Sequence, residues 1–128
     1  MQKHAGILFI SKSSSKILLI LDGSHWTVPS FSRSKTVVED SAEMIVEYVG
    51  KETKLIPIEL YVSKDNGFEF STYICMVDKE FLPNNDNSFC WTSMDCLPKG
   101  VHTGLKNTLG NKINKTKIDT VLLMGRSQ

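Results

Sequence analysis

The stretch WTVPSFSRSKTVVEDSAEMIVEYVG, Trp26–Gly50, carries the strongest fold signal in the sequence, because it joins a polar loop to a well-marked helix. Thr36 stands three residues before Glu39, the spacing of a capping box in which both residues satisfy backbone donors at a helix N-terminus. Gly50 supplies the residue that most easily turns left-handed after a last helical turn. The stretch therefore predicts a helix over residues 36–49.

This predicted helix has three distinct sides. At about 100° per residue, four apolar residues form a stripe that would pack on a sheet, and three glutamates form a second stripe. The apolar stripe consists of Val38, Ala42, Ile45 and Val49, and the acidic stripe of Glu39, Glu43 and Glu47. Met44 and Tyr48 would occupy the third side.

Runs of β-branched and large apolar residues predict strands on both sides of this helix. The predicted strands cover residues 4–11, 16–22, 55–63 and 67–78. The pair Asn66-Gly67 is a hairpin signal, a second helix is predicted to begin near Val101, and the final run IDTVLLM fits either a strand or a helical turn. With 128 residues the chain has material for one core, so we expect a single α+β domain over residues 1–128.

Charge and cysteine usage make several classes of function less favoured, and nucleic-acid binding is unlikely without being excluded. A net charge of +1 gives no overall attraction to nucleic acid, and the sequence holds no run long enough to span a membrane. The C-terminal lysines favour a solvated helix face over a phosphate site; they are Lys106, Lys112, Lys115 and Lys117. Cys75, Cys90 and Cys96 lack C-x-x-C spacing and no signal peptide is recognised, so we expect a reduced, cytoplasmic protein. A zinc site that includes Cys90 and Cys96 is the less favoured alternative to buried apolar cysteines.

The loop and helix resemble the box of the Nudix hydrolase family, G-x5-E-x7-R-E-U-x-E-E-x-G-U, where U is a bulky aliphatic residue. The segments HAGILFIS, KILLILD, WTVP, FEFSTYICMV, FLP and FCWTSMDCLPKGVHTGL also resemble short, phage-type members, so that the similarity covers residues 4–110. The resemblance implies a Nudix-type α/β/α sandwich with a mixed β-sheet. It also implies hydrolysis of nucleoside diphosphates linked to another group, with magnesium as the metal.

Aligned on Gly50, the sequence departs from this box at the metal-binding positions. The family's R-E pair falls on Glu43 and Met44, and its E-E pair on Glu47 and Tyr48. A thioether and a phenol replace two carboxylates, and neither is a good ligand for a hard cation. The resemblance thus implies a degenerate metal site in which Glu47 is the surviving catalytic carboxylate.

Two features keep a working metal site open as an alternative. Glu43 and Glu47 are one turn apart and could hold Mg²⁺ or Mn²⁺ from a rotated position, with Asp40 assisting. Asp86 falls near the place where many phage sequences of this family carry a Glu-His pair, which implies a further ligand or general base there. The competing interpretation is an acidic, solvated helix face.

Three residues are candidates for substrate binding. Trp26 and Phe31 flank the loop before the helix, where their rings would stack on a base or cover the edge of the core. Arg33 would pair with a phosphate or point into solvent. His102 precedes the second helix, where it would cap that helix or fill a cleft.

The sequence therefore predicts a Nudix protein whose catalysis is weak or lost and whose role is to bind a nucleotide-like small molecule or a protein partner. The alternative is an active metal-dependent pyrophosphohydrolase with a rearranged carboxylate site. The cofactor would be Mg²⁺ or Mn²⁺ in an active protein, and none is required in a silent one. If the chain is encoded by a phage, the expected location is the host cytoplasm.

The metal prediction can be tested by thermal unfolding. Because magnesium affinity requires several converging oxygens, Glu43 and Glu47 alone should bind it weakly, and low-millimolar Mg²⁺ or Mn²⁺ should barely change the melting temperature. A clear rise in the wild type that disappears in Glu43→Gln or Glu47→Gln would contradict this expectation and favour the active enzyme.

Overall fold

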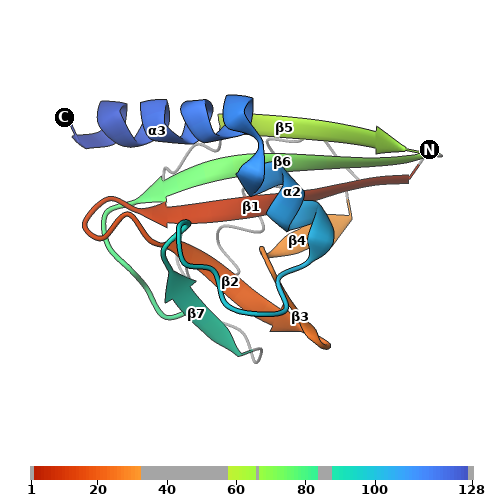
Figure 1. Ribbon diagram of the computed structural model, residues 1–128, viewed down its shortest axis with the longest axis horizontal. Coiled ribbons are helices and arrows are strands. Elements are labelled where there is room, and N and C mark those ends of the chain that lie inside the picture. The colour runs from red at the N-terminus through yellow and green to blue at the C-terminus, as the bar shows by residue number, and fades with distance from the viewer. Residues whose placement is uncertain (1, 33–57, 66, 84–87, 127–128) are drawn as a thin grey trace.

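Strand β1 (Gln2–Ser11) lies inside a mixed sheet of seven strands, shown in Figure 1. The computed structural model describes residues 2–32, 58–65, 67–83 and 88–126. The strand order is β3-β2-β1-β6-β5, with β4 paired to β1 and β7 paired to β2. The remaining strands are β2 (Ile17–Asp22), β3 (His25–Thr27), β4 (Ser30–Ser32), β5 (Ile58–Asp65), β6 (Phe68–Val77) and β7 (Phe89–Thr92).

The pairing of β1 with β6 is parallel and runs from Gln2 opposite Phe68 to Ser11 opposite Val77, whereas the other strand pairs are antiparallel. Successive side chains of β1 point to opposite faces of the sheet. Leu8 and Ile10 join the core beneath the helices, and Ile7 and Phe9 join a second core on the other face. Both faces of β1 are therefore buried, which explains its continuous apolar run.

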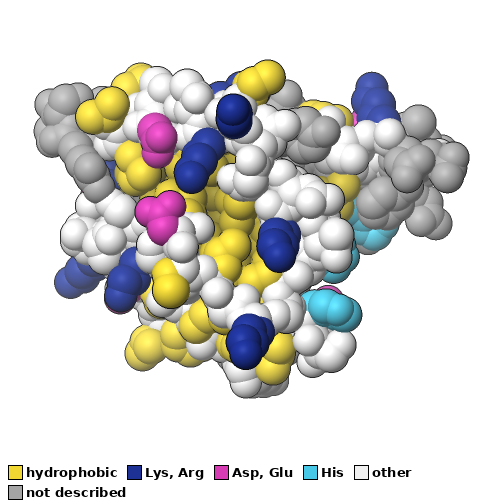
Figure 2. Space-filling view, in the orientation of Figure 1, with side chains coloured by type: hydrophobic (Ala, Val, Ile, Leu, Met, Phe, Trp, Pro, Cys, Tyr) yellow, Lys and Arg dark blue, Asp and Glu magenta, His cyan; other side chains and the backbone are white. Residues whose placement is uncertain are grey.

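Two helices cover one face of the sheet. Helix α2 (Thr103–Gly110) contributes Leu105 and Leu109 to the core, and α3 (Lys112–Arg126) contributes Ile118 and Leu122. In Figure 1, α3 runs along β5 and β6 while α2 crosses in front of β1. Figure 2, drawn from this side, shows apolar side chains reaching the surface in a hollow near the centre of this face.

Asn111 separates the two helices. Its backbone is extended (φ −74°, ψ 129°), and its side-chain Oδ1 accepts hydrogen bonds from the backbone N–H groups of Ile113 at 2.9 Å and Asn114 at 3.2 Å. These donors have no partner within the first turn of a helix, so Asn111 is the N-cap of α3.

A lysine fastens α3 to the edge of the sheet. The register of β5 against β6 shifts between Glu59 and Tyr61, which leaves Leu60 at a β-bulge. Lys117 Nζ donates to the Leu60 carbonyl oxygen at 3.1 Å. The ammonium group thus satisfies a backbone acceptor at the irregularity, where the sheet ladder is interrupted.

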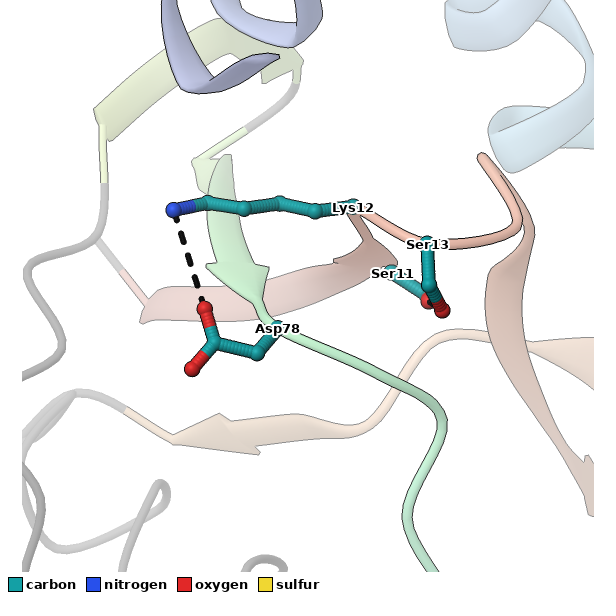
Figure 3. A network of polar contacts seen from close by, with 4 residues as sticks. All are labelled: Ser11, Lys12, Ser13 and Asp78. Atoms are coloured by element: carbon teal, nitrogen blue, oxygen red, sulfur yellow. Dashed lines mark hydrogen bonds and ion pairs between the residues drawn. The ribbon is translucent and has the colours of Figure 1, made fainter. Parts of the chain in front are cut away.

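The turn between β1 and β2 is tied to the end of β6, as Figure 3 shows. The Lys12 ammonium lies 3.7 Å from an Asp78 carboxylate oxygen, and the Ser11 and Ser13 hydroxyls are 3.0 Å apart. The Asp78 side chain is 95% exposed, so this ion pair contributes little. The backbone bonds from Lys12 N–H to Val77 O at 2.8 Å and from Ser13 N–H to Asp78 O at 3.2 Å hold the turn more firmly.

Aromatic side chains extend the core on the second face. Phe81 makes edge-to-face contacts with Phe9 and with Trp91, each at a ring-centroid distance of 5.3 Å. The indole N–H of Trp91 also donates to the Phe81 carbonyl oxygen at 3.0 Å. The segment after β6 is therefore anchored to both β1 and β7.

The structure confirms the predicted α+β architecture around a mixed β-sheet, and the four predicted strands correspond to β1, β2, β5 and β6. Gly67, with φ +79°, lies in the predicted hairpin turn. The run IDTVLLM lies inside α3, which excludes the strand alternative, because the apolar residues Ile118 and Leu122 are one turn apart and face the core together. The predicted helix over 36–49, with its apolar stripe and with Met44 and Tyr48, falls outside the described residues.

Replacing Asn111 with alanine should lower the stability of the protein. Both first-turn donors of α3 would lose their acceptor, which typically costs about 1 kcal/mol, or a fall of roughly 3–5 °C in melting temperature. Asn111→Asp keeps an acceptor and should remain close to the wild type. An equal loss in both variants, measured by thermal unfolding, would mean that the cap contributes nothing.

Candidate functional site

A cavity of about 620 Å³ opens between α2 and the sheet, and we call it the α2 cavity. This volume lies in the range of small-molecule sites. The described residues that line it are Asp22, Thr27, Val28, Ser30, Ser63, Phe70, Thr72, His102, Gly104, Leu105, Asn107, Thr108, Asn111 and Asn114. The cavity is thus lined by residues that are far apart in the sequence, from β2 to α3.

The floor of the cavity forms around Gly6. In the sheet register, Gly6 lies opposite Ser30 on β4 and Thr72 on β6, and both of these residues line the cavity. A Cβ atom at Gly6 would stand 2.8 Å from Val28 Cγ2 and 3.1 Å from Phe70 Cζ. The absent side chain therefore lets Val28 and Phe70 close over the strand and shape the floor.

Side chains of α2 form the opposite wall. Gly104, Asn107, Thr108 and Asn111 recur at helical spacing and share one side. Leu105 both lines the cavity and belongs to the core, whereas Leu109 belongs to the core alone. The start of α2 is fastened to β3: Trp26 N–H donates to Gly100 O, and His102 N–H donates to Trp26 O, both at 2.8 Å.

Asn114 is the most buried polar residue of the wall, with 2% exposure. Its Nδ2 donates to the Thr108 carbonyl oxygen at 3.0 Å and so closes the joint between α2 and α3. Within the described part of the chain, no protein donor is directed to its Oδ1. Asn114 also lines the α2 cavity, so the joint between the two helices borders this space.

The lining is polar but carries little charge. Among the described lining residues, Asp22 is the only carboxylate, His102 is the only basic group, and lysine and arginine are absent. Asparagine amides, threonine and serine hydroxyls and the Phe70 ring suit an uncharged group that has both a flat apolar face and hydrogen-bonding edges. Phosphate, which pairs best with arginine or lysine, finds no partner of that kind there.

Of the predicted site residues, the structure describes only Trp26 and Phe31. Trp26 is half-buried and packs against the core beneath the helices, and it does not line the α2 cavity. Phe31 pairs through its backbone with Ala5. Arg33, Glu43, Glu47 and Asp86 lie outside the described residues, so their predicted roles in substrate binding, metal binding and catalysis stay predictions.

The described residues contain no cluster of three or more histidine, cysteine or acidic side chains that could hold a metal ion. All three cysteines are free, and they range from buried Cys75 to exposed Cys96. Burial raises the pKa of the Cys75 thiol to about 12 and the pKa of Cys90 in the same direction, so both thiols stay protonated at neutral pH. In the described segments, no helix has the length and apolar character needed to cross a membrane.

The sequence matches no family model and no curated protein sequence. Its fold matches solved Nudix hydrolases. The E. coli dihydroneopterin triphosphate pyrophosphohydrolase aligns with a TM-score of 0.63 and 10% identity over 94% of each chain. An Ap4A hydrolase from C. elegans aligns with a TM-score of 0.64 and 13% identity, over 98% of this chain and 99% of the other. The MutT protein from Bacillus halodurans aligns with a TM-score of 0.63 and 14% identity, over 88% of this chain and 82% of the other. The chain therefore has a Nudix fold.

Sequence reasoning singled out His102 but missed the rest of the cavity wall. Asn107, Asn111 and Asn114 follow it at helical spacing within a segment predicted to be helical, and this amide-rich spacing was the available signal. Gly6 gave no signal, because only its contacts with Val28 and Phe70 explain why a glycine stands in an apolar strand.

Gly6→Ala should disturb the cavity floor. The new methyl group would force Val28 and Phe70 to move, and such overpacking typically costs about 1–3 kcal/mol. Gly110→Ala is the matched control, since a Cβ there meets nothing within 4 Å and alanine favours the helix. Chemical denaturation would measure both variants, and an unchanged Gly6→Ala protein would refute the close approach.

Proposed function

We propose that the protein binds the uncharged ring of a nucleotide-like small molecule in the α2 cavity, and that its hydrolytic activity is weak or lost. The observation that carries this proposal is the lining of the cavity, which combines asparagine amides and hydroxyls with the Phe70 ring. A nucleobase presents hydrogen-bonding groups on its edge and an apolar face, which match the lining amides and the Phe70 ring.

The charge of the lining suggests that only the ring of such a ligand would enter the α2 cavity. Since no described lysine or arginine lines the α2 cavity and Asp22 stands at it, the phosphates of such a ligand would lie outside it. Solved structures of the same fold include an Ap4A hydrolase and a dihydroneopterin triphosphate pyrophosphohydrolase, whose names denote ligands that join a ring system to phosphates. That likeness supports the ligand class for this chain without identifying the base.

The proposal of weak catalysis rests on the sequence. Met44 and Tyr48 stand where the family resemblance places two metal-binding carboxylates, and neither would hold magnesium well. The alternative, an active pyrophosphohydrolase that uses Glu43, Glu47 and Asp86, requires a rearranged metal site. In that case the metal would activate water and neutralise charge at phosphorus.

Binding should be measured by calorimetry with the four ribonucleosides and their 5′-monophosphates. We expect at least one nucleoside to bind, and its monophosphate to bind no more than a few-fold tighter, because the described lining provides no cation for the phosphate. Asn107→Ala should weaken binding about threefold to tenfold by removing a hydrogen-bonding side chain from the wall. Lys106→Ala, on the same helix but outside the lining, is the control and should bind normally.

Two results would overturn the proposal. If no nucleoside binds, or if Lys106→Ala loses as much affinity as Asn107→Ala, the α2 cavity is not the ligand site. If the purified protein hydrolyses nucleoside diphosphate derivatives rapidly with Mg²⁺ or Mn²⁺, and Glu47→Gln abolishes this turnover, then the protein is an active pyrophosphohydrolase and the proposal of weak or lost catalysis is wrong. Without ligand binding or turnover, the protein-binding role becomes the better hypothesis, with the exposed Ile113 and Leu123 of α3 as its starting point.

A further inference from the structure

His102 caps the N-terminus of α2 and also lines the α2 cavity. It is the N-cap of that helix, with φ −53° and ψ 133°, and its Nδ1 accepts a hydrogen bond from the Gly104 backbone N–H at 3.1 Å. The same ring lines the α2 cavity. One side chain therefore both fixes the first turn of the wall and forms part of its surface.

The fit between His102 and Gly104 is close. A Cβ atom at Gly104 would stand 3.2 Å from the Cε1 atom of the His102 ring and 3.3 Å from Nδ1, tighter than most real contacts. Gly104 therefore lets the imidazole lie directly against the helix backbone. The backbone bond from His102 N–H to Trp26 O holds the backbone of this exposed residue from the other side.

We propose that His102 is a positioning residue of the α2 cavity: its neutral ring holds the first turn of α2 in place, and protonation of the ring releases that turn and weakens ligand binding. The ligand-binding part of this inference rests on the proposed function. The positioning part rests on the cap geometry alone and can be tested without a ligand.

The chemistry of the cap sets the direction of the pH effect. A neutral imidazole has one nitrogen that accepts, whereas the imidazolium ion carries hydrogen on both nitrogens and accepts at neither. The hydrogen bond from Gly104 N–H is thus available only to the neutral ring. Protonation of the ring therefore removes the acceptor and the stabilisation that the cap gives.

Two other titratable groups lie near His102. On β3, the His25 ring lies 6.2 Å from the His102 ring between centroids, at an interplanar angle of 76°, so that protonation of both rings would place two positive charges side by side. Asp22 at the end of β2 lines the same cavity and is the only carboxylate among its described lining residues. The other titratable groups of the adjoining described segments are Lys99 before the cap and Lys106 in α2, and both are cationic and exposed.

The experiment compares wild type with His102→Asn, His102→Leu and His25→Asn. Asparagine is an effective N-cap that does not titrate, and leucine removes the acceptor. In the ligand-free protein, NMR would follow the Gly104 backbone amide and the Asn107 and Asn111 side-chain amides from about pH 7.5 to about pH 5.5, where histidine gains a proton. Calorimetry with the tightest-binding nucleoside would give the affinity at both ends of this range.

We expect the wild-type amide signals to move as the pH falls and the affinity to drop about threefold to tenfold, the range that loss of a cap implies. His102→Asn keeps an N-cap that does not titrate, so its affinity should show no comparable decline between the two pH values. His102→Leu should resemble the acidified wild type at every pH, with a melting temperature about 3–5 °C lower. His25→Asn should retain the pH response in reduced form.

Several outcomes would overturn the inference. One is a Gly104 amide signal that is the same in wild type and His102→Leu. Another is a pH response that persists in His102→Asn and disappears in His25→Asn, which would assign the titration to His25. If the Gly104 and asparagine signals follow His102 but no nucleoside binds, the positioning role holds and the proposed ligand class fails.

Discussion

The parallel pairing of β1 with β6 is the interaction on which the rest of the structure depends. It places a strand with two buried faces beneath both apolar layers, so that Leu8 and Ile10 support the helices while Ile7 and Phe9 support the second core. The same register sets Gly6 opposite Thr72 and His4 opposite Phe70, which fixes the floor of the α2 cavity. Stability and cavity shape thus come from one ladder of backbone hydrogen bonds.

The shape of the α2 cavity depends on two glycines, where the absence of a side chain lets neighbouring groups approach the backbone. Gly6 lets Val28 and Phe70 approach the strand, and Gly104 lets the His102 ring lie against the helix. Asn114 joins α2 to α3 through the hydrogen bond from its Nδ2 to Thr108 O, and it also lines the cavity. A Nudix fold does not by itself assign a reaction, because activity resides in particular side chains placed on the fold. In this chain the described lining of the α2 cavity offers amides, hydroxyls and an aromatic ring, whereas the predicted metal ligands lie outside the described residues.

Local patterns were enough to predict most of the described fold. The runs that form β1, β2, β5 and β6 and the hairpin at Gly67 follow from residue preferences and turn chemistry that act over a few positions. The short strands β3 and β4 were predicted as loop, because their three-residue pairings depend on neighbouring strands. The α2 cavity could not be predicted from the sequence for the same reason. Its lining residues Ser30, Phe70 and Asn114 come together only after the sheet and helices have packed. His102 was an exception, since a histidine directly before a helix has few roles other than capping it or filling a cleft.

The central ladder also determines how the chain must reach this state. β1 and β6 join residues about half the chain apart, so a large loop has to close before the central pairing gains any stability. Chains dominated by such distant contacts fold slowly, on the order of milliseconds to seconds. During that interval the apolar segment GILFIS of β1 has unpaired backbone groups along its edges and can pair with another copy of itself. The pairing that stabilises the finished sheet therefore leaves the unfinished chain open to aggregation.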